Sequence, residues 1–256
     1  MASSSGKTFD QVNATAANTK YTINKYKWHP YVTIDGKRWA TENIGATATN
    51  PNGHYFAWGY TEGCVRNSAN DGWVLASDNT TARQFNNSTY TSKTASTFED
   101  AAYANWGGDW RMPTSDEFHT LLKNRFSAWT NNFNSQSVKG LIVWEAQSGD
   151  AGYYKPANYS SNQICRKIED NGTTSYESHL VSYNYESTTP LIFFPAAGYG
   201  NISTLSTSSN YFWSSTFDSS GKALILNFRQ VNPNDDLQTK CACMQYIGMP
   251  IRPVSD

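Results

Sequence analysis

The stretch Asn105-Trp-Gly-Gly-Asp-Trp-Arg-Met-Pro-Thr114 decides how the first half of this chain folds. Gly107 and Gly108 can adopt the positive φ that commonly ends a helix. Pro113 disfavours helical backbone at the residue before it, and Thr114 has the side chain of a helix N-cap. The stretch is therefore predicted to be a turn that joins two helices.

Two Ser/Thr-x-x-Glu patterns predict where those helices begin. They are Ser96-Thr-Phe-Glu99 and Thr114-Ser-Asp-Glu117, in which the hydroxyl and the glutamate can each satisfy a backbone N–H group of the first turn. We expect helices over residues 97–106 and 114–126. In the second helix, four apolar side chains recur at spacings of three and four and should form its buried face: Phe118, Leu121, Leu122 and Phe126.

Strand-like patterns and turn residues occur on both sides of these helices. Before them, Tyr31-Val-Thr-Ile34 and Lys37-Arg-Trp-Ala40 flank Asp35-Gly36, a two-residue hairpin signal. Residues 62–96 have the polar composition of long loops with short strands. The polar stretches at 145–190 and 200–210 are predicted to be loops. Further strands are expected at residues 140–144, 191–194, 211–213, 223–228 and 251–254.

Several side chains have the chemistry of a scaffold. We expect Trp110 and Met112 to be buried, and Arg111 to bind a carboxylate or helix-end carbonyl groups. Trp213 is expected to anchor the core, with the hydroxyls that follow it satisfying backbone groups at a strand end. Arg252, near the end of the chain, is a candidate for a buried ion pair.

Five motifs occur in a fixed order from about residue 30 to the C-terminus: Asp35–Asn43, the 105–114 stretch, Phe193–Tyr199, Tyr211–Thr216 and Gly248–Val254. In these motifs the chain resembles the fibrobacter-type major paralogous domain family, which consists of secreted or surface proteins abundant in gut bacteria. That family is similar to the C-type-lectin fold of formylglycine-generating enzymes and of variable proteins diversified by retroelements. The resemblance implies a loop-rich α+β fold of C-type-lectin type, with two helices, a mixed or antiparallel sheet, and pairing of the first and last strands.

Length and composition narrow the functional classes. No repeat or linker divides residues 26–256, so we expect one domain after a polar tail or linker at residues 1–25. The net charge is −1 and only 16% of the residues are charged, which offers no electrostatic attraction for nucleic acid or an anionic membrane. Aromatic residues make up 14%, as is common in recognition proteins.

The expected location follows from the resemblance and the composition. No apolar run reaches the ~18 residues of a membrane-spanning segment. The first residues, Met1–Lys7, lack the apolar core of a signal peptide. We expect an extracellular or cell-surface protein, as a lipoprotein whose leader has been removed or in association with a phage.

Residues 217–246 mix charged, aromatic, thiol and amide side chains without a core period. In retroelement-diversified proteins of the resembling fold, the corresponding segment forms the exposed binding face. The resemblance therefore implies a non-catalytic adhesion protein whose partner is a macromolecular receptor or a glycan. The alternative is an ordinary surface segment in a carbohydrate-binding lectin of fixed sequence. The candidate ligand-binding residues are Tyr211, Phe217, Asp218, Lys222, Arg229, Gln230, Asp236, Cys241, Cys243, Gln245 and Tyr246.

Metal chemistry is a weaker alternative in the same segment. Formylglycine-generating oxidases bind copper with a late cysteine pair, but Cys241 and Cys243 are closer together than that family's pair. With Cys64 and Cys165 they allow three disulfide pairings, although a direct Cys241–Cys243 bridge would need a Cα separation near the upper limit. Calcium needs six to eight oxygens, so Asn232-Pro-Asn-Asp-Asp236 is better interpreted as a solvated turn. We expect no catalysis and no cofactor.

Overall fold

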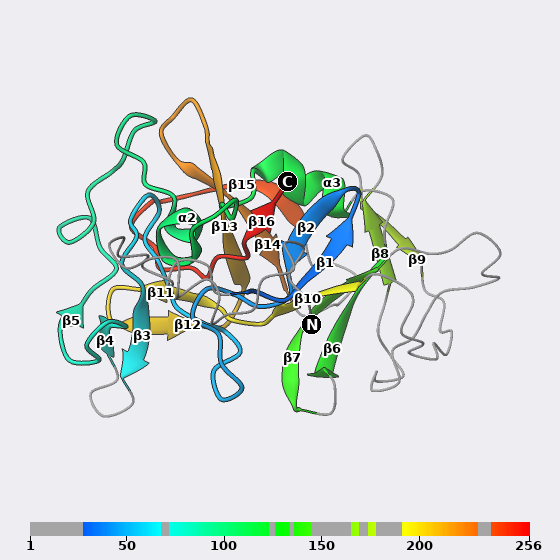
Figure 1. Cartoon of the computed structure of the whole chain (residues 1–256), viewed down its shortest axis with the longest axis horizontal. Coiled ribbons are helices and arrows are strands. Elements are labelled where there is room, and N and C mark those ends of the chain that lie inside the picture. The colour runs from blue at the N-terminus through cyan, green and yellow to red at the C-terminus, as the bar shows by residue number, and fades with distance from the viewer. Residues whose placement is uncertain are drawn as a thin grey trace, which may run out of the picture.

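The computed structural model describes most of the chain from residue 28 onward (Figure 1). The N-terminal tail predicted at residues 1–25 lies outside the described residues. With two short helices and several small antiparallel sheets, the described part is α+β. The described ranges are 28–67, 72–122, 126–133, 136–144, 165–168, 174–177, 191–229 and 237–256.

A three-stranded sheet joins the two ends of the described chain, in the order β1-β2-β16. The expected hairpin of β1 (Tyr31–Ile34) and β2 (Lys37–Ala40) is confirmed. Asp35 and Gly36 form its turn with φ values of 51° and 75°, which a two-residue turn of this kind requires. β16 (Val254–Ser255) lies on the other edge of β2.

The prediction for the last strand is wrong in both length and partner. Strand structure was expected over residues 251–254 with pairing to the first strand, but β16 begins at Val254 and pairs with β2. Proline has no N–H group, so Pro250 and Pro253 cannot donate to a ladder. Instead, the Pro253 carbonyl accepts from the Ala40 amide at 3.0 Å. Val254 also exchanges two backbone hydrogen bonds with Arg111, which places β16 between β2 and the 105–114 stretch.

The largest sheet has five antiparallel strands in the order β10-β7-β6-β8-β9. Two of its strands fall in the 145–190 stretch that was predicted to be a loop, because β8 and β9 form a hairpin that pairs with β6. Phe126, expected at the end of the second helix, is the first residue of β6. The bounds are β6 (Phe126–Phe133), β7 (Val138–Trp144), β8 (Cys165–Ile168), β9 (Thr174–Glu177) and β10 (Leu191–Pro195).

The sheet β13-β14-β15 carries most of the candidate ligand-binding residues. Its strands are β13 (Asn210–Phe217), β14 (Ala223–Phe228) and β15 (Gln238–Cys243). The strand expected at 223–228 is confirmed, whereas β15 was not anticipated. One face of this sheet packs against the second helix, where Asp116 forms an ion pair with Lys240 at 2.6 Å.

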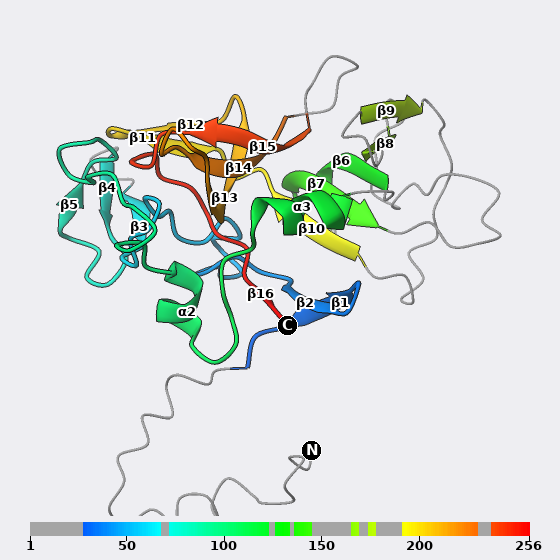
Figure 2. The same ribbon diagram turned by 90° about the horizontal axis from the view of Figure 1, so that it is seen from above.

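Two smaller sheets complete the fold. The short strands expected within 62–96 are β3 (Cys64–Asn67), β4 (Gly72–Leu75) and β5 (Ala82–Arg83). The stretch 200–210, predicted to be a loop, contains part of a hairpin formed by β11 (Tyr199–Asn201) and β12 (Thr204–Ser206). Seen from above, β11, β12 and β15 lie on one side of the molecule and β1 and β2 on the other (Figure 2).

The first helix begins later than its capping pattern predicts. α2 (Ala101–Trp106) starts after Asp100, whose carboxylate accepts hydrogen bonds from the amides of Ala102 and Tyr103. The prediction of helix from residue 97 is therefore wrong, because the side chain that caps the first turn is Asp100, four residues beyond Ser96. Gly107 and Gly108 have φ values of 69° and 60°, as expected for the turn that follows.

The capping pattern of the second helix is confirmed in both directions. The Thr114 amide donates to the Glu117 carboxylate at 2.8 Å, and the Glu117 amide donates to the Thr114 hydroxyl at 3.1 Å. α3 (Ser115–Leu122) is shorter than the predicted helix. No helix in the described ranges combines the length and the apolar character needed to cross a membrane.

Buried apolar side chains fill the space between the sheets and helices. Trp213 is one of them and is fully buried, as expected. Its indole N–H donates to the Phe56 carbonyl at 2.8 Å. The Ser214 hydroxyl donates to the Leu224 carbonyl at 2.6 Å, in agreement with the expected role of the hydroxyls after Trp213. Met112 is buried as predicted, and Trp110 is half-buried.

Arg252 is buried as predicted, but its partners correct the expectation of an ion pair. Its guanidinium donates to Asn43 Oδ1 at 2.9 Å and to the carbonyls of Ala40 and Phe193 at 2.9 and 2.8 Å. Among the residues that the structure describes, no carboxylate lies within ion-pairing distance. Burial lowers the pKa of Arg252 to about 9, so the group stays charged at neutral pH and joins three segments through neutral oxygens.

Candidate functional site

The candidate ligand-binding residues lie on the face of the β13-β14-β15 sheet opposite α3, around the buried side chains of Trp213 and Ile225, and at the two ends of that sheet. Gln230 and Asp236 lie outside the described residues, as does the predicted turn at 232–236. The other nine lie in or beside β13, β14 and β15. They form three groups: the sheet face, the end at the β13–β14 turn, and the end near Arg229.

The sheet face brings Tyr211, Cys241 and Cys243 together. Cross-strand pairing places Trp213, Ile225 and Cys241 in one row, and neighbouring rows contain Tyr211 and Cys243. Residues opposite one another in an antiparallel sheet point to the same side. Each of the three candidate side chains is half-buried.

Two further tyrosines extend this face. Tyr199 of β11 stacks on Tyr211 with ring centroids 4.6 Å apart and an interplanar angle of 14°. Tyr246 follows β15 and packs against two clusters of buried side chains, one that contains Trp213 and one that contains Trp73. We call Tyr199, Tyr211, Cys241, Cys243 and Tyr246 the tyrosine–thiol face. All five are half-buried, so each presents part of its side chain to solvent.

The end at the β13–β14 turn carries the most exposed apolar side chains near this face. Phe217 is 39% exposed and contacts the Trp58 ring edge-on at 5.6 Å, and Met244 is 49% exposed. Lys222 is also exposed. This end therefore offers apolar contact area beside a cation.

Asp218 serves the turn itself. Its Oδ1 accepts hydrogen bonds from the Ser220 hydroxyl at 2.7 Å and from the amides of Ser220 and Lys222 at 2.8 and 2.9 Å. These hydrogen bonds lower the pKa of Asp218, and the bond from the Ser220 hydroxyl has the largest effect. The carboxylate holds the Phe217 end of the hairpin in one conformation.

Gln245 corrects the expectation of an exposed ligand-binding side chain, because it is only 5% exposed. Its amide N donates to the Lys93 carbonyl at 3.0 Å and to the Gly221 carbonyl at 2.7 Å, and its Oε1 accepts from the Lys93 amide. Gln245 therefore joins the β13–β14 turn to the loop at residue 93. It positions the neighbouring surface without being part of it.

The other end of the sheet is polar. Arg229 is exposed, and its Nε donates to the Ser209 hydroxyl at 2.9 Å. Ser209 is buried and lies two residues before Tyr211, so the Arg229 contact is close to the tyrosine–thiol face. Opposite Tyr211, Asn227 is 5% exposed and its Oδ1 has no hydrogen-bond partner among the described residues.

Among the residues that the structure describes, Cys64, Cys241 and Cys243 form no disulfide. Burial raises the pKa of Cys243 to about 12, so its sulfur is protonated at neutral pH. A protonated thiol is a weak nucleophile and a poor metal ligand. Within the described ranges, no three His, Cys, Asp or Glu side chains are grouped so that they could hold a metal ion.

The sequence interpretation missed Tyr199 and Met244. Met244 lies inside the 217–246 segment and had the same signal as its neighbours. Tyr199 belongs to a scaffold-like motif and is distant in sequence, so only the fold brings it to Tyr211. No protein-family model, curated protein or solved structure matches this chain.

Proposed function

We propose that this chain is a non-catalytic adhesion protein that binds a macromolecular receptor through the tyrosine–thiol face and the adjoining Phe217 end. The observation that carries the proposal is the half-buried state of all five residues of that face beside exposed Phe217 and Met244. Large aromatic side chains on a stiff sheet provide contact area at a low cost in conformational entropy. Aromatic and arginine side chains also dominate the binding energy of protein interfaces.

The fold belongs to the same proposal. The α+β arrangement, the confirmed β1–β2 hairpin and the Gly107-Gly108 turn between two helices support a C-type-lectin-like domain over residues 26–256. By the resemblance of its motifs, the chain would act outside the cell or on its surface, as a lipoprotein or in association with a phage. If it belongs to a diversified set, residues 217–246 would differ between copies of the gene. A reverse transcriptase gene and a near-copy template repeat beside this gene would test that point.

A protein receptor is favoured over a glycan at this face. Glycan-binding surfaces need many polar groups free to meet hydroxyls, whereas most of the described candidates here are aromatic, apolar or already hydrogen-bonded, like Asp218 and Gln245. Lys222 and Arg229 are the exposed polar exceptions. A fixed-sequence lectin would bind a defined sugar with the same residues. A copper oxidase would need reactive thiolates, and the raised pKa of Cys243 argues against that role.

Site-specific photo-crosslinking tests the proposal. A photoreactive amino acid at position 217 should yield a defined adduct with surface proteins of neighbouring bacteria, and excess unlabelled chain should suppress it. A competitor carrying Phe217→Ala and Arg229→Ala should not suppress it. The matched control places the same group at Tyr103, which is 60% exposed on α2. Equal adducts from both positions, or equal suppression by both competitors, would contradict the proposal.

The double variant is chosen so that folding is preserved. Both Phe217 and Arg229 are exposed, so their removal should change the melting temperature little. Tyr246 is left intact because it packs against two clusters of buried side chains. Its removal could destabilise the fold, and a loss of binding would then have two explanations. A melting curve of each competitor before the crosslinking experiment checks this assumption.

A further inference from the structure

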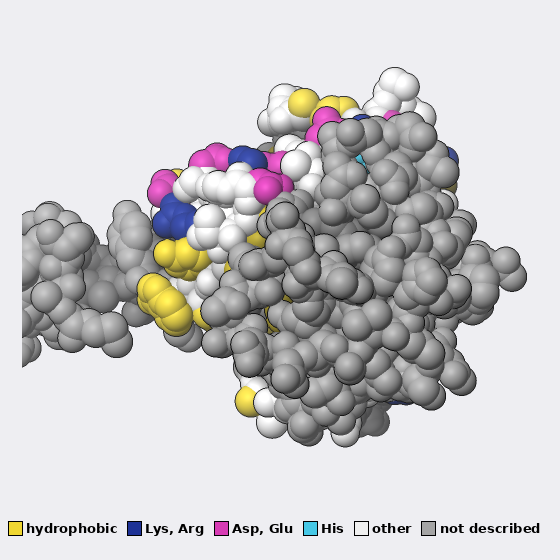
Figure 3. Space-filling view, turned by 90° about the vertical axis from the view of Figure 1, so that its right-hand side faces the viewer, with side chains coloured by type: hydrophobic (Ala, Val, Ile, Leu, Met, Phe, Trp, Pro, Cys, Tyr) yellow, Lys and Arg dark blue, Asp and Glu magenta, His cyan; other side chains and the backbone are white. Residues whose placement is uncertain are grey.

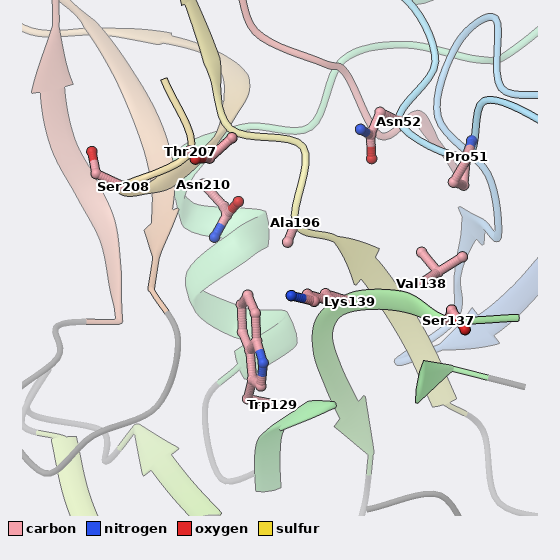
Figure 4. A pocket seen from close by; sticks show the side chains of 10 residues that line it. All are labelled: Pro51, Asn52, Trp129, Ser137, Val138, Lys139, Ala196, Thr207, Ser208 and Asn210. Atoms are coloured by element: carbon pink, nitrogen blue, oxygen red, sulfur yellow. The ribbon is translucent and has the colours of Figure 1, made fainter. Parts of the chain in front are cut away.

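A pocket lies on the opposite side of β13 from the tyrosine–thiol face. It has a volume of about 700 Å³ and lies between the β6–β7 hairpin, the loop at residues 51–52 and the turn before β13 (Figure 4). Asn210 lines it, whereas the next residue, Tyr211, faces the other way. Small-molecule sites typically measure about 300–1,000 Å³, so the hollow is large enough for a ligand.

Lys139 is the charged group of this pocket. Its side chain is exposed, and in Figure 4 the ammonium points toward the indole of Trp129. No described carboxylate forms an ion pair with Lys139 or lines the described part of the pocket. An ammonium without a counter-ion in a concave site attracts an anion.

The wall beside Lys139 is fixed in place. Asn210 is buried, its Oδ1 accepts from the Gly198 amide at 3.0 Å, and its Nδ2 donates to the Phe228 carbonyl at 3.2 Å. The Trp129 indole N–H donates to Asn131 at 3.0 Å, which holds the ring on the floor of the pocket. A site with fixed walls binds at a lower entropic cost.

The remaining lining offers neutral hydrogen-bonding groups and small apolar surfaces. Thr207 and Ser208 are exposed and place two hydroxyls on one rim. Ala196 and Val138 supply apolar patches between the polar groups. A matching ligand has one negative charge, several hydroxyls and exposed C–H faces.

We propose that this pocket binds a sugar that carries one carboxylate, with the carboxylate against Lys139 and the hydroxyls toward Thr207 and Ser208. A compact multivalent anion such as phosphate fits less well, because Lys139 is the only cation among the lining residues that the structure describes. The proposal is independent of the receptor face, since the pocket shares no residue with it. The chain would then have a small-molecule site separate from its adhesion surface.

NMR titration of the whole chain with D-glucuronate, D-glucose and acetate tests this site. D-Glucuronate should shift the amide signals around Lys139 and Thr207 in a saturable way. D-Glucose lacks the charge and acetate lacks the hydroxyls, so each should bind at least about fivefold more weakly. No saturable shift with D-glucuronate would overturn the proposal, as would equal affinity for acetate, which would indicate a simple anion site.

The lysine is tested by variants at an exposed position. Lys139→Gln should lower the affinity for D-glucuronate by about fivefold or more, and Lys139→Arg should retain it. Lys222→Gln, at the β13–β14 turn and outside this pocket, is the matched control and should bind D-glucuronate like the unmodified chain. A smaller loss in Lys139→Gln would overturn the assignment of the carboxylate to Lys139. The Phe217→Ala, Arg229→Ala variant should still bind D-glucuronate, so failure at one site is distinguishable from failure at the other.

Discussion

Arg111 and Glu117 bind each other through two parallel hydrogen bonds, in which Nη1 donates to Oε2 and Nη2 to Oε1, each at 2.7 Å. Lys37 of β2 reaches the same carboxylate at 3.0 Å. Arg111 also contacts Asp256 at the end of the chain. Acidic and basic side chains accordingly lie next to each other on the coloured part of the surface in Figure 3. This network joins the helix connection, α3, β2 and the last strand.

Replacing Glu117 should reveal how much this network stabilises the fold. Burial alone would raise the pKa of Glu117, but hydrogen bonds from Arg111, Thr114 and Lys37 outweigh it and hold the pKa at about 2. Glu117→Gln should lower the free energy of unfolding at pH 7 by about 1–3 kcal/mol, because the charged hydrogen bonds are lost. Chemical denaturation at several pH values measures this difference.

The pH dependence follows from the direction of the shift. A carboxyl group whose pKa is lower in the folded chain contributes fully above its unfolded pKa, near 4.5, and loses its contribution as the pH falls toward 2. The difference between the unmodified chain and Glu117→Gln should therefore shrink across that window. Asp109→Asn is the control, because Asp109 is 84% exposed and its removal should cost less than about 0.5 kcal/mol. A difference that is constant from pH 7 to pH 2 would contradict this account.

The first helix offers a direct comparison of two possible caps. Asp100→Ala should destabilise the chain by about 1–2 kcal/mol, because its carboxylate also accepts from the Met112 amide at 2.9 Å. Ser96→Ala should cost less than about 0.5 kcal/mol, because Ser96 lies outside the helix and is exposed. Thermal unfolding of both variants checks the order, and a larger loss in Ser96→Ala would restore the earlier helix start.

The two capping patterns show why local sequence predicts one helix start and misses the other. The pattern at Thr114 needs only groups within four residues, all of which are visible in the sequence. At Ser96 the same pattern competes with Asp100, which also bonds to Met112 across the Gly-Gly turn. That contact depends on the path of the connection, which a local pattern does not contain.

The same distinction applies to the candidate site. The sequence located the segment and its aromatic and thiol residues. The inward turn of Gln245 depends on two carbonyls, at Lys93 and Gly221, that accept its amide hydrogens. The Tyr199–Tyr211 stack depends on the β11–β12 hairpin, which was predicted to be mostly loop. Tertiary contacts between distant segments determine which candidates are exposed.

The thiol of Cys243 should be unreactive in the folded chain. Its pKa is raised from 9.0 to about 12 by burial, so at pH 8 the thiolate fraction is about a thousandfold lower than in the unfolded chain. Alkylation by iodoacetamide, followed by peptide mass spectrometry, should show a rate reduced by about that factor relative to the chain in denaturant. Similar rates in the two states would mean that Cys243 is an accessible thiolate, and would reopen the metal-binding alternative.

The amide hydrogens of Gln245 should be essential for holding the β13–β14 turn against the loop at residue 93. Gln245→Ala removes the donors to the Lys93 and Gly221 carbonyls, two part-buried hydrogen bonds, so it should lower the free energy of unfolding by about 1–3 kcal/mol. In Gln245→Glu the side chain can still accept from the Lys93 amide. Its carboxylate, however, would lie against the two carbonyl oxygens and has no hydrogen to donate to them. It should therefore cost more than Gln245→Ala at pH 7.

The pH dependence of Gln245→Glu separates a hydrogen-bonding role from simple packing. The carboxylate is disfavoured in the folded chain, which raises its pKa there. Its penalty should therefore be fully present above the raised folded pKa, shrink as the pH falls towards the unfolded pKa of about 4.3, and be absent below it, where protonation restores one donor. Gln84→Ala is the control, since Gln84 is exposed, and it should change stability by less than about 0.5 kcal/mol. Hydrogen exchange at the Lys93 amide should accelerate in Gln245→Ala, because that amide loses its acceptor. Unchanged exchange, together with a pH-independent penalty in Gln245→Glu, would mean that the side chain only fills space and that the β13–β14 turn is held by its own Asp218 bonds.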